Sequence, residues 1–235
     1  MSSVSAVLLA AKEAKNLEIM LPLLHEILQG VTGDYEILVV DTAKPLDNAQ
    51  DVCAQYDVMY IPQEEPGYGG AFRTGVKYAS KEKLLFLDCD FSHDPNVIPE
   101  LYAKSEEGYN VVIGSRYTKG GKSDGTKSAK LMSLWLNLVF RTFLGIKAKD
   151  ISTSYRIYVS SQVKSIQLKC VNYDILEEVL FILKQNYKDF VIAEVPIHFK
   201  KRYFGESKRR LLRFIVAFLK TLFRLFFKRI TGQKS

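Results

Sequence analysis

Short apolar runs alternate with segments of helical periodicity along the first half of the chain. An apolar run of about four to eight residues predicts a buried strand, and apolar residues spaced three and four apart predict a helix. The expected strands span residues 4–10, 36–40, 58–61, 83–87 and 111–114. The expected helices span residues 13–28, 47–56 and 96–107, and residues 69–80 are expected to form a loop that runs into a further helix.

This alternation of strands and helices predicts an α/β fold. The short links between elements favour a mostly parallel sheet that is covered by helices on both faces. Such sheets bind ligands beyond the carboxyl ends of their strands. The first candidates for a functional site are therefore the polar residues at these ends: Glu13, Asp41, Gln63, Asp88, Asp90 and Arg116.

The pattern changes after Arg116. Residues 119–130 are rich in Gly, Lys and Ser, so a mobile loop is expected there. Residues 131–140 are apolar with one Trp and predict a helix. Residues 150–158, a helical stretch near 173–184 and a strand at 190–195 follow, and residues 208–230 close the chain as a long basic helix.

The positive charge of the chain is concentrated at its C-terminal end. Residues 200–235 contain twelve Lys or Arg and one acid, which gives a local net charge of +11. Residues 1–199 contain 21 basic and 25 acidic residues, which gives a net charge of −4. A basic tail can meet phosphate on nucleic acid, on lipid headgroups or on a substrate.

On a helical wheel, the expected C-terminal helix separates its basic residues from its apolar residues. Arg209, Arg213, Lys220, Arg224 and Lys228 form a basic stripe, and Leu212, Ile215, Phe218, Leu219, Leu222, Phe223, Phe226 and Phe227 form a broad apolar face. Such a helix is typical of the interface of an anionic membrane. The alternative is a helix that packs on the domain core or on a partner helix, including that of a membrane protein. Nucleic acid is not expected, because the aromatic residues do not alternate with the basic ones as stacking platforms.

The N-terminus and the cysteines bear on the compartment. The first apolar run has no basic segment before it and no convincing cleavage site, so no signal peptide is expected. No uncharged apolar run approaches the roughly 18–20 residues of a spanning helix. The three cysteines, Cys53, Cys89 and Cys170, are scattered along the chain. This pattern indicates reduced thiols and a cytoplasmic protein.

The strongest chemical signal is the pair of carboxylates Asp88 and Asp90 at the end of an expected strand. In extended chain, side chains at i and i+2 lie on one face. Unpaired charges are costly to bury in a core, whereas one or two carboxylates together with substrate phosphates suit Mg²⁺ or Mn²⁺. For the spacing alone, a solvated turn or a helix N-cap is the alternative.

Three further motifs suggest the binding of an anion. Gly69 and Ala71 belong to a glycine-rich stretch before a helix, where backbone N–H groups could approach a phosphate. The spacing is not GxGxxG, which disfavours a dinucleotide site. Arg116 ends the fifth expected strand, and Arg, Ser and Lys surround a glycine in residues 202–208. Arg and Lys in such places suit phosphates, although each motif alone also fits an ordinary surface loop.

In this order, the motifs resemble the GT-A family 2 glycosyltransferases, specifically the dolichol-phosphate mannose synthase branch and its bacterial polyprenyl-phosphate relatives. The resemblance runs from about residue 4 to about residue 208 through FLDCDFSHDPNVIPEL, VVIGSRYTKGG, STSYRIY and EVPIHFKKRYFGESKRR. Two departures lie where the family contacts the nucleotide base. Asp41-Thr42 stands for the usual Asp-Asp, and Ala11-Lys12-Glu13 stands for Tyr-Asn-Glu.

The resemblance implies a Rossmann-like GT-A fold and a role for each matching residue. Asp88 and Asp90 would bind the metal, and the catalytic residues would be Asp90, Arg116, which meets phosphate, and Glu178, near the donor sugar. The donor-binding residues would be Ala11, Glu13, Asp41, Gly69, Ala71, Asp88, Arg202, Ser207 and Lys208.

The resemblance also implies the reaction. We expect a metal-dependent, inverting transferase that moves mannose or glucose from a GDP- or UDP-linked donor to a polyprenyl or dolichyl phosphate. Residues 1–207 would form the GT-A catalytic domain, and residues 208–235 would form a membrane-interface helix and tail at the cytoplasmic face. The alternatives are a transferase of the same fold that acts on a growing glycan, and a non-catalytic nucleotide-sugar-binding protein. An acceptor phosphate is already anionic near pH 7 and needs positioning more than a base, so His93 is expected to be a structural, hydrogen-bonded residue.

Overall fold

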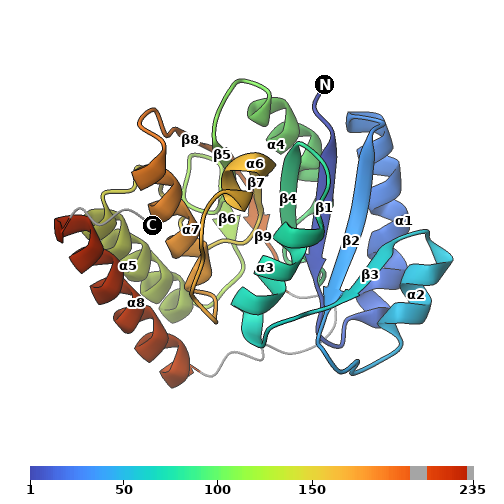
Figure 1. The fold of residues 1–235 in the computed structure, drawn as a ribbon, viewed down its shortest axis with the longest axis horizontal. Helices are drawn as coiled ribbons and strands as arrows, with labels where there is room; N and C mark the ends of the chain where they lie inside the picture. The colour runs from blue at the N-terminus through green and yellow to red at the C-terminus, as the bar shows by residue number, and fades with distance from the viewer. Residues whose placement is uncertain (202–210, 232–235) are drawn as a thin grey trace.

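The computed structural model describes residues 1–201 and 211–231 of the 235-residue chain. Figure 1 shows a central sheet with helices on both sides. Two long helices, α5 (Lys127–Leu144) and α8 (Leu211–Thr231), lie side by side at one end of the molecule.

Within the described residues, the main sheet has seven strands in the order β3-β2-β1-β4-β7-β5-β8. The strands are Val4–Leu9 (β1), Tyr35–Asp41 (β2), Met59–Pro62 (β3), Lys83–Asp88 (β4), Val111–Ser115 (β5), Arg156–Val159 (β7) and Ile192–Pro196 (β8). Neighbouring strands are parallel except where β7 pairs with β4 and with β5. The predicted mostly parallel sheet is confirmed, and β7 is a reversed strand that the apolar pattern had not identified.

Helices cover both faces of this sheet. The remaining helices are Ala14–Val31 (α1), Ala49–Gln55 (α2), Gly67–Tyr78 (α3), Ile98–Ser105 (α4), Ser160–Lys164 (α6) and Ile175–Asn186 (α7), with a 3-10 turn at Pro95–Val97 before α4. Alternate strand residues enter two separate hydrophobic clusters. Val7 and Phe86 pack with α3 and α7, whereas Leu8 and Leu87 pack with α1 and α4. Because both faces are buried, the strands require the continuous apolar runs that predicted them.

Two expectations about loops were wrong. The helix α3 begins at Gly67, so the glycine-rich residues expected to form a loop from position 69 lie in its first turns. In the stretch 119–130, β6 (Lys122–Ser123) pairs with β9 (His198–Phe199), and α5 already begins at Lys127. The partner of β6 is distant in sequence, so no local pattern could have indicated this pairing.

The helix α8 packs against α5 and α7 along part of its apolar face. Phe218, Leu222 and Leu225 are buried, and the Phe218 ring lies 5.3 Å from the Phe140 ring of α5. Leu219, Phe223 and Phe227 remain exposed. The apolar face predicted for this helix is therefore divided between the domain core and the surface. The predicted helix is present from Leu211, and residues 208–210 lie outside the described residues.

Among the described residues, no helix combines the length and the apolar character that crossing a bilayer requires.

Candidate active site

The carboxyl ends of β1, β2 and β4 open into a cavity of about 370 Å³, which we call the strand-end cavity. Ala11 and Glu13 follow β1, Thr42 follows β2, Asp88 ends β4, and Asp90 follows it. These side chains meet because the strands are parallel and end at the same edge of the sheet. Several of the strand-end residues that the sequence singled out thus lie together at one cavity.

Asp88 and Asp90 both line the strand-end cavity, as their spacing predicts. Asp88 is the last residue of β4, and its Oδ1 accepts a hydrogen bond of 2.9 Å from the Ser154 hydroxyl. Asp90 is 3% exposed, and its Oδ1 accepts a hydrogen bond of 3.0 Å from the backbone N–H of Ser92. The two side chains are therefore held by a neighbouring hydroxyl and by a turn.

The carboxylate pair fits a divalent cation that is shared with a ligand. No cluster of three or more His, Cys, Asp or Glu that could hold a metal occurs among the described residues. Mg²⁺ typically binds one or two carboxylates and takes its other ligands from water and substrate phosphates. Asp88 and Asp90 at the wall of an open cavity match that arrangement, since the cavity leaves room for a phosphate opposite them.

His93 is a structural residue of this region. It is 1% exposed, its Nδ1 accepts from the Asp88 backbone N–H at 3.3 Å, and its Nε2 lies 3.3 Å from the Thr153 hydroxyl. An ion pair with the Asp88 carboxylate, at 3.7 Å, would require a protonated ring. Burial lowers the pKa of His93, although Asp88 opposes the shift, and the accepting Nδ1 carries no proton. The ring is therefore neutral.

Asp41 does not line the strand-end cavity. It is fully buried, and its carboxylate accepts hydrogen bonds from the Thr42 backbone N–H at 2.7 Å and from the Tyr60 hydroxyl at 3.0 Å. Thr42 lines the cavity instead. The structure thus places the predicted donor-binding acid one residue behind the cavity wall, where it fixes the turn that presents Thr42.

Gly69 and Ala71 lie at the start of α3, and of these two only Ala71 lines the strand-end cavity. The Gly69 N–H donates a hydrogen bond of 2.8 Å to the Val171 carbonyl. A Cβ at position 69 would lie 2.1 Å from the Cys170 carbonyl oxygen. Gly69 is therefore required for close packing of α3 on residues 170–171, and its N–H is already engaged by protein.

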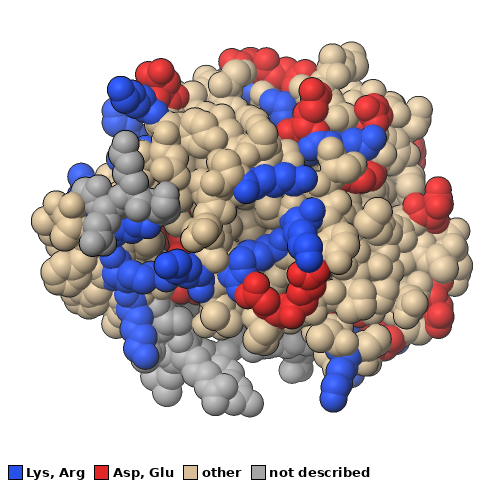
Figure 2. Space-filling view, viewed as in Figure 1, with Lys and Arg blue, Asp and Glu red and all other residues tan. Residues whose placement is uncertain are grey.

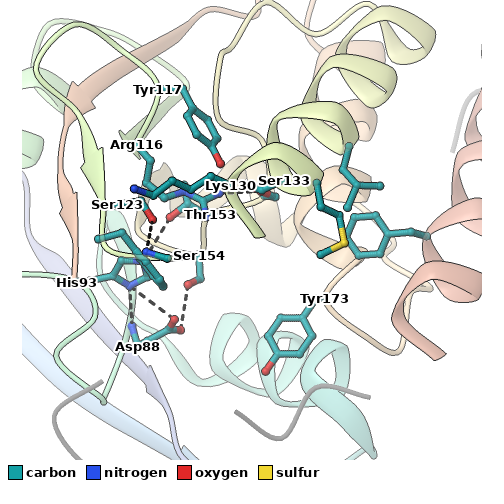
Figure 3. Close-up of a pocket in the computed structure, with 16 residues that line it drawn as sticks. Asp88, His93, Arg116, Tyr117, Ser123, Lys130, Ser133, Thr153, Ser154 and Tyr173 are labelled. Carbon is teal, nitrogen blue, oxygen red and sulfur yellow. Dashed lines mark hydrogen bonds and ion pairs between the residues drawn. The ribbon is translucent and has the colours of Figure 1, made fainter. Parts of the chain in front are cut away.

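A second cavity, of about 290 Å³, adjoins the first, and we call it the helix-lined cavity (Figure 3). Asp88 and Tyr173 line both cavities. Figure 3 shows Tyr173 across the cavity from Asp88 and His93. Half of the other described residues that line the helix-lined cavity come from the turn after β5, from α5 and from α8: Arg116, Tyr117, Lys130, Met132, Ser133, Leu136 and Phe218. The other half come from the loop after β4, from β6 and the turn after it, from the segment before β7 and from β9: His93, Ser123, Gly125, Ser152, Thr153, Ser154 and Phe199. Two cavities therefore meet at Asp88 and Tyr173.

Arg116 lines the helix-lined cavity while paired with a buried acid. Its Nε and Nη2 donate to the two carboxylate oxygens of Asp150 at 2.7 and 2.8 Å. Burial alone raises the pKa of Asp150, but the hydrogen bonds and charge of Arg116 hold that pKa below its ordinary value. The pair is ionised, and Arg116 is fixed in orientation. Sequence analysis missed Asp150, because its partner is distant in the chain.

The remaining predicted site residues lie elsewhere. Glu178 lines neither cavity; it is 2% exposed and pairs with Arg224 at 2.7 Å. Arg202, Ser207 and Lys208 lie outside the described residues. Sequence analysis also gave no role to Lys130 and Tyr173, both of which line a cavity. The only signal for either was position: Lys130 lies just before an apolar helical stretch, and Tyr173 begins another.

The mostly parallel sheet, with a carboxylate pair at the edge where its strands end, defines an α/β protein of the GT-A type. The chain belongs to glycosyl transferase family 2, whose model matches residues 6–164.

Two curated relatives are similar to most of this chain. A dolichol-phosphate mannosyltransferase of Pyrococcus furiosus is 34% identical over 230 residues, which cover 94% of this chain and 63% of that protein. An undecaprenyl-phosphate mannosyltransferase of Micrococcus luteus is 30% identical over 200 residues, which cover 80% of this chain and 81% of that protein. The chain thus spans less than two thirds of the length of the first relative.

Solved structures confirm the fold. Glucosyl-3-phosphoglycerate synthase of Mycobacterium tuberculosis, in complex with Mn²⁺, UDP and phosphoglyceric acid, aligns with a TM-score of 0.74 at 18% identity, over 96% of this chain and 78% of that one. Its complex with Mg²⁺ and UDP aligns with a TM-score of 0.72 at 17% identity, over 95% and 79%. At this identity the likeness concerns the fold, and it bears out the predicted GT-A architecture.

Proposed function

We propose that this chain transfers mannose or glucose from a GDP- or UDP-linked donor to a polyprenyl phosphate at a membrane surface. The main support is the pair of adjoining cavities that meet at Asp88. Both curated relatives are named as mannosyltransferases of a polyprenyl phosphate.

The strand-end cavity suits the donor. Asp88 and Asp90 would hold Mg²⁺ or Mn²⁺, and such an ion, when bound, offsets the charge of the departing nucleoside diphosphate. The M. tuberculosis synthase binds Mn²⁺ or Mg²⁺ together with UDP. Ala11, Glu13 and Thr42 would contact the nucleoside, and Arg202, Ser207 and Lys208 would contact the donor phosphates.

The helix-lined cavity suits a lipid phosphate. Met132, Leu136 and Phe218 give it apolar residues, and Lys130 supplies positive charge. Because Asp150 already neutralises Arg116, Lys130 is the cation that would pair with an incoming phosphate. These apolar residues suit a lipid chain better than a growing glycan, which offers hydroxyl groups, although Ser123, Ser133, Ser152, Thr153 and Ser154 also line this cavity.

The outer sides of α5 and α8 expose apolar side chains beside this cavity. We call them the apolar surface: Leu131, Leu134, Trp135, Leu138, Leu219, Phe223, Phe227 and Ile230. Trp135 is 63% exposed and Phe227 is 61% exposed. Figure 2 shows Lys and Arg side chains gathered over α8. Apolar residues beside basic ones complement an anionic membrane, so a lipid could enter the cavity without leaving the bilayer.

The proposed reaction is a single displacement. A phosphate oxygen of the acceptor forms a bond to the anomeric carbon, and the bond from that carbon to the donor diphosphate breaks. Lys130 would orient the acceptor phosphate, which is already anionic and needs no base. Attack opposite the leaving group inverts the anomeric centre.

The proposal includes a division of labour along the chain. Residues 1–207 would form the catalytic domain, and residues 208–235 would form the membrane-interface helix and tail at the cytoplasmic face. The three cysteines are unpaired and buried, which agrees with a reducing compartment.

The decisive experiment incubates the purified chain with GDP- and UDP-linked mannose and glucose, Mn²⁺ and a short-chain polyprenyl phosphate. We expect an EDTA-sensitive glycolipid with an inverted anomeric centre. Transfer to an oligosaccharide but not to the lipid would indicate the glycan-elongating alternative. Nucleotide-sugar binding with neither transfer nor donor hydrolysis would indicate a binding protein.

A further inference from the structure

The side chain of Glu178 connects three separate segments of the molecule. It lies on α7 and is 2% exposed. Its Oε2 accepts hydrogen bonds of 2.8 Å from the backbone N–H groups of Lys169 and Cys170. Its Oε1 accepts a hydrogen bond of 2.7 Å from the guanidinium of Arg224 on α8. One buried carboxylate thus fixes α7, α8 and residues 169–173 relative to one another.

Residues 169–173, which we call the wall segment, form part of both cavities. Asn172 lines the strand-end cavity, and Tyr173 lines both cavities. The Tyr173 ring stacks on the Tyr68 ring of α3, with 4.2 Å between the centroids. The position of Tyr173 at the junction of the cavities therefore depends on how the wall segment is held.

The helix α3 holds the wall segment from the opposite side to α8. Arg73 donates a hydrogen bond of 2.7 Å to the Cys170 carbonyl, and Gly69 donates one of 2.8 Å to the Val171 carbonyl. These contacts join the wall segment to the donor side of the molecule. The Glu178–Arg224 pair joins it to α8.

The helix α8 faces two environments. Thr221 donates a hydrogen bond of 2.6 Å to the buried Asp174 carboxylate, and Arg224 also lies 2.9 Å from the Cys170 sulfur. On its other side, Phe223 and Phe227 are exposed and belong to the apolar surface. Arg224, which the helical wheel had assigned to a basic stripe facing the membrane, instead directs its charge at Glu178.

We propose that Arg224 is a positioning residue that acts through Glu178 to hold the wall segment, and with it Tyr173, at the junction of donor and acceptor. The assignment of the two sides of this junction to donor and acceptor rests on the proposed function. Loss of Arg224 would deprive a buried carboxylate of its hydrogen-bonded charge partner, which is costly, and would leave it with the more distant charge of Lys228, so the wall segment would open locally. The helix that meets the membrane would thus also set the geometry of the site.

Hydrogen exchange of the full chain tests the first half of this proposal. Arg224→Ala should speed exchange of the Lys169 and Cys170 amides by roughly tenfold, as expected for a coupled pair. The matched control is Arg229→Ala on the same helix, since Arg229 donates to the carbonyls of Thr142 and Phe143 at the end of α5 instead. If the Lys169 and Cys170 amides exchange equally fast in both variants, the proposal is overturned.

Binding and turnover test the second half. Titration with GDP and with UDP, each with Mn²⁺, should show weaker nucleotide binding for Arg224→Ala and unchanged binding for Arg229→Ala. With a short-chain soluble acceptor, Arg224→Ala should lower kcat, and Arg224→Lys should restore part of it. In a double-mutant cycle with Glu178→Gln, the effects should be strongly non-additive.

Two outcomes of these measurements separate the proposals. Faster exchange with unchanged nucleotide affinity and kcat, or additive effects in the cycle, would reduce Arg224 to a purely structural role and refute the inference. Absence of transfer by the wild-type chain would refute the proposed function alone, because exchange and nucleotide titration need no acceptor.

Discussion

The strand-end cavity and the helix-lined cavity share Asp88 and Tyr173 but are built in different ways. The first takes its polar residues from turns that directly follow parallel strands, so the hydrogen bonds of the sheet fix them. The second takes Arg116 and Ser154 from beside strands β5 and β7, but part of its wall comes from α5 and α8, which meet the sheet only through tertiary packing. Substitutions in the strand-end cavity should therefore lower turnover with little effect on folding. Substitutions in the helix-lined cavity should weaken binding of the acceptor and leave nucleotide binding unchanged.

The largest expected effect is that of Asp90→Asn in the strand-end cavity. Loss of one carboxylate of the pair removes electrostatic stabilisation of the departing diphosphate, so kcat should fall by roughly 10²–10³-fold. Turnover at saturating Mn²⁺ measures this effect. The control is Asp94→Asn, because Asp94 faces Lys200 at 2.7 Å outside both cavities and Asn retains its capping ability. Full activity of Asp90→Asn after EDTA treatment would remove the metal from the mechanism.

The next effect belongs to the helix-lined cavity. Lys130→Ala should weaken binding of the acceptor by about 1.5–3 kcal/mol, the contribution of one charge-assisted contact. The KM for polyprenyl phosphate should rise while nucleotide affinity stays constant, which would separate the two cavities by ligand. Lys127→Ala removes a charge from the same helix at an exposed position outside both cavities. If Lys127→Ala changes KM equally, Lys130 contributes only to the overall positive potential and makes no specific contact with the acceptor phosphate.

The packing between the two regions can be tested at Gly69. A Cβ there would lie 2.1 Å from the Cys170 carbonyl oxygen, so Gly69→Ala must push α3 away from the wall segment. Overpacking of this kind destabilises a fold by about 1–3 kcal/mol. Gly30→Ala on α1 is the control, because a Cβ at that position would meet nothing within 4 Å and Ala favours the helix by about 0.5–1 kcal/mol. Urea midpoints that move in the same direction for both variants would contradict this account.

The sequence predicted the strand-end region well because its signals are local. Apolar runs located β1, β2 and β4, and the spacing of Asp88 and Asp90 placed both side chains in one cavity. The glycines of α3 were the exception. They resembled a phosphate-binding loop, but the contact that requires Gly69 comes from residues 170–171, which are distant in sequence.

The helix-lined region was less predictable because its contacts are long-range. The pairing of Arg116 with Asp150 and that of Arg224 with Glu178 join residues far apart in the chain. A helical wheel contains no information about neighbouring elements. It therefore assigned Arg224 to a membrane-facing stripe and could not divide the apolar residues between core and surface. For the same reason β7, whose two neighbours are β4 and β5, was not identified as a strand.

The smallest expected effect concerns the surface of α8. Lys220 is exposed on the helix beside Phe223, which is 58% exposed. A basic residue near an anionic membrane contributes about 1 kcal/mol, so Lys220→Ala should weaken binding to phosphatidylserine-containing vesicles by about fivefold. The difference should fade as salt is added. Binding to neutral phosphatidylcholine vesicles should be unchanged.

Two companion variants complete this comparison. Phe223→Ser should weaken binding to both kinds of vesicle, because it removes apolar area and not charge. Lys15→Ala, an exposed lysine of α1 on the other face of the sheet, should leave vesicle binding unchanged. A truncation before α8 would test less, since it would also remove the buried Phe218, Leu222 and Leu225 from the core. If Lys15→Ala weakens vesicle binding as much as Lys220→Ala does, the membrane responds to net charge alone, and the apolar surface is not the face that docks.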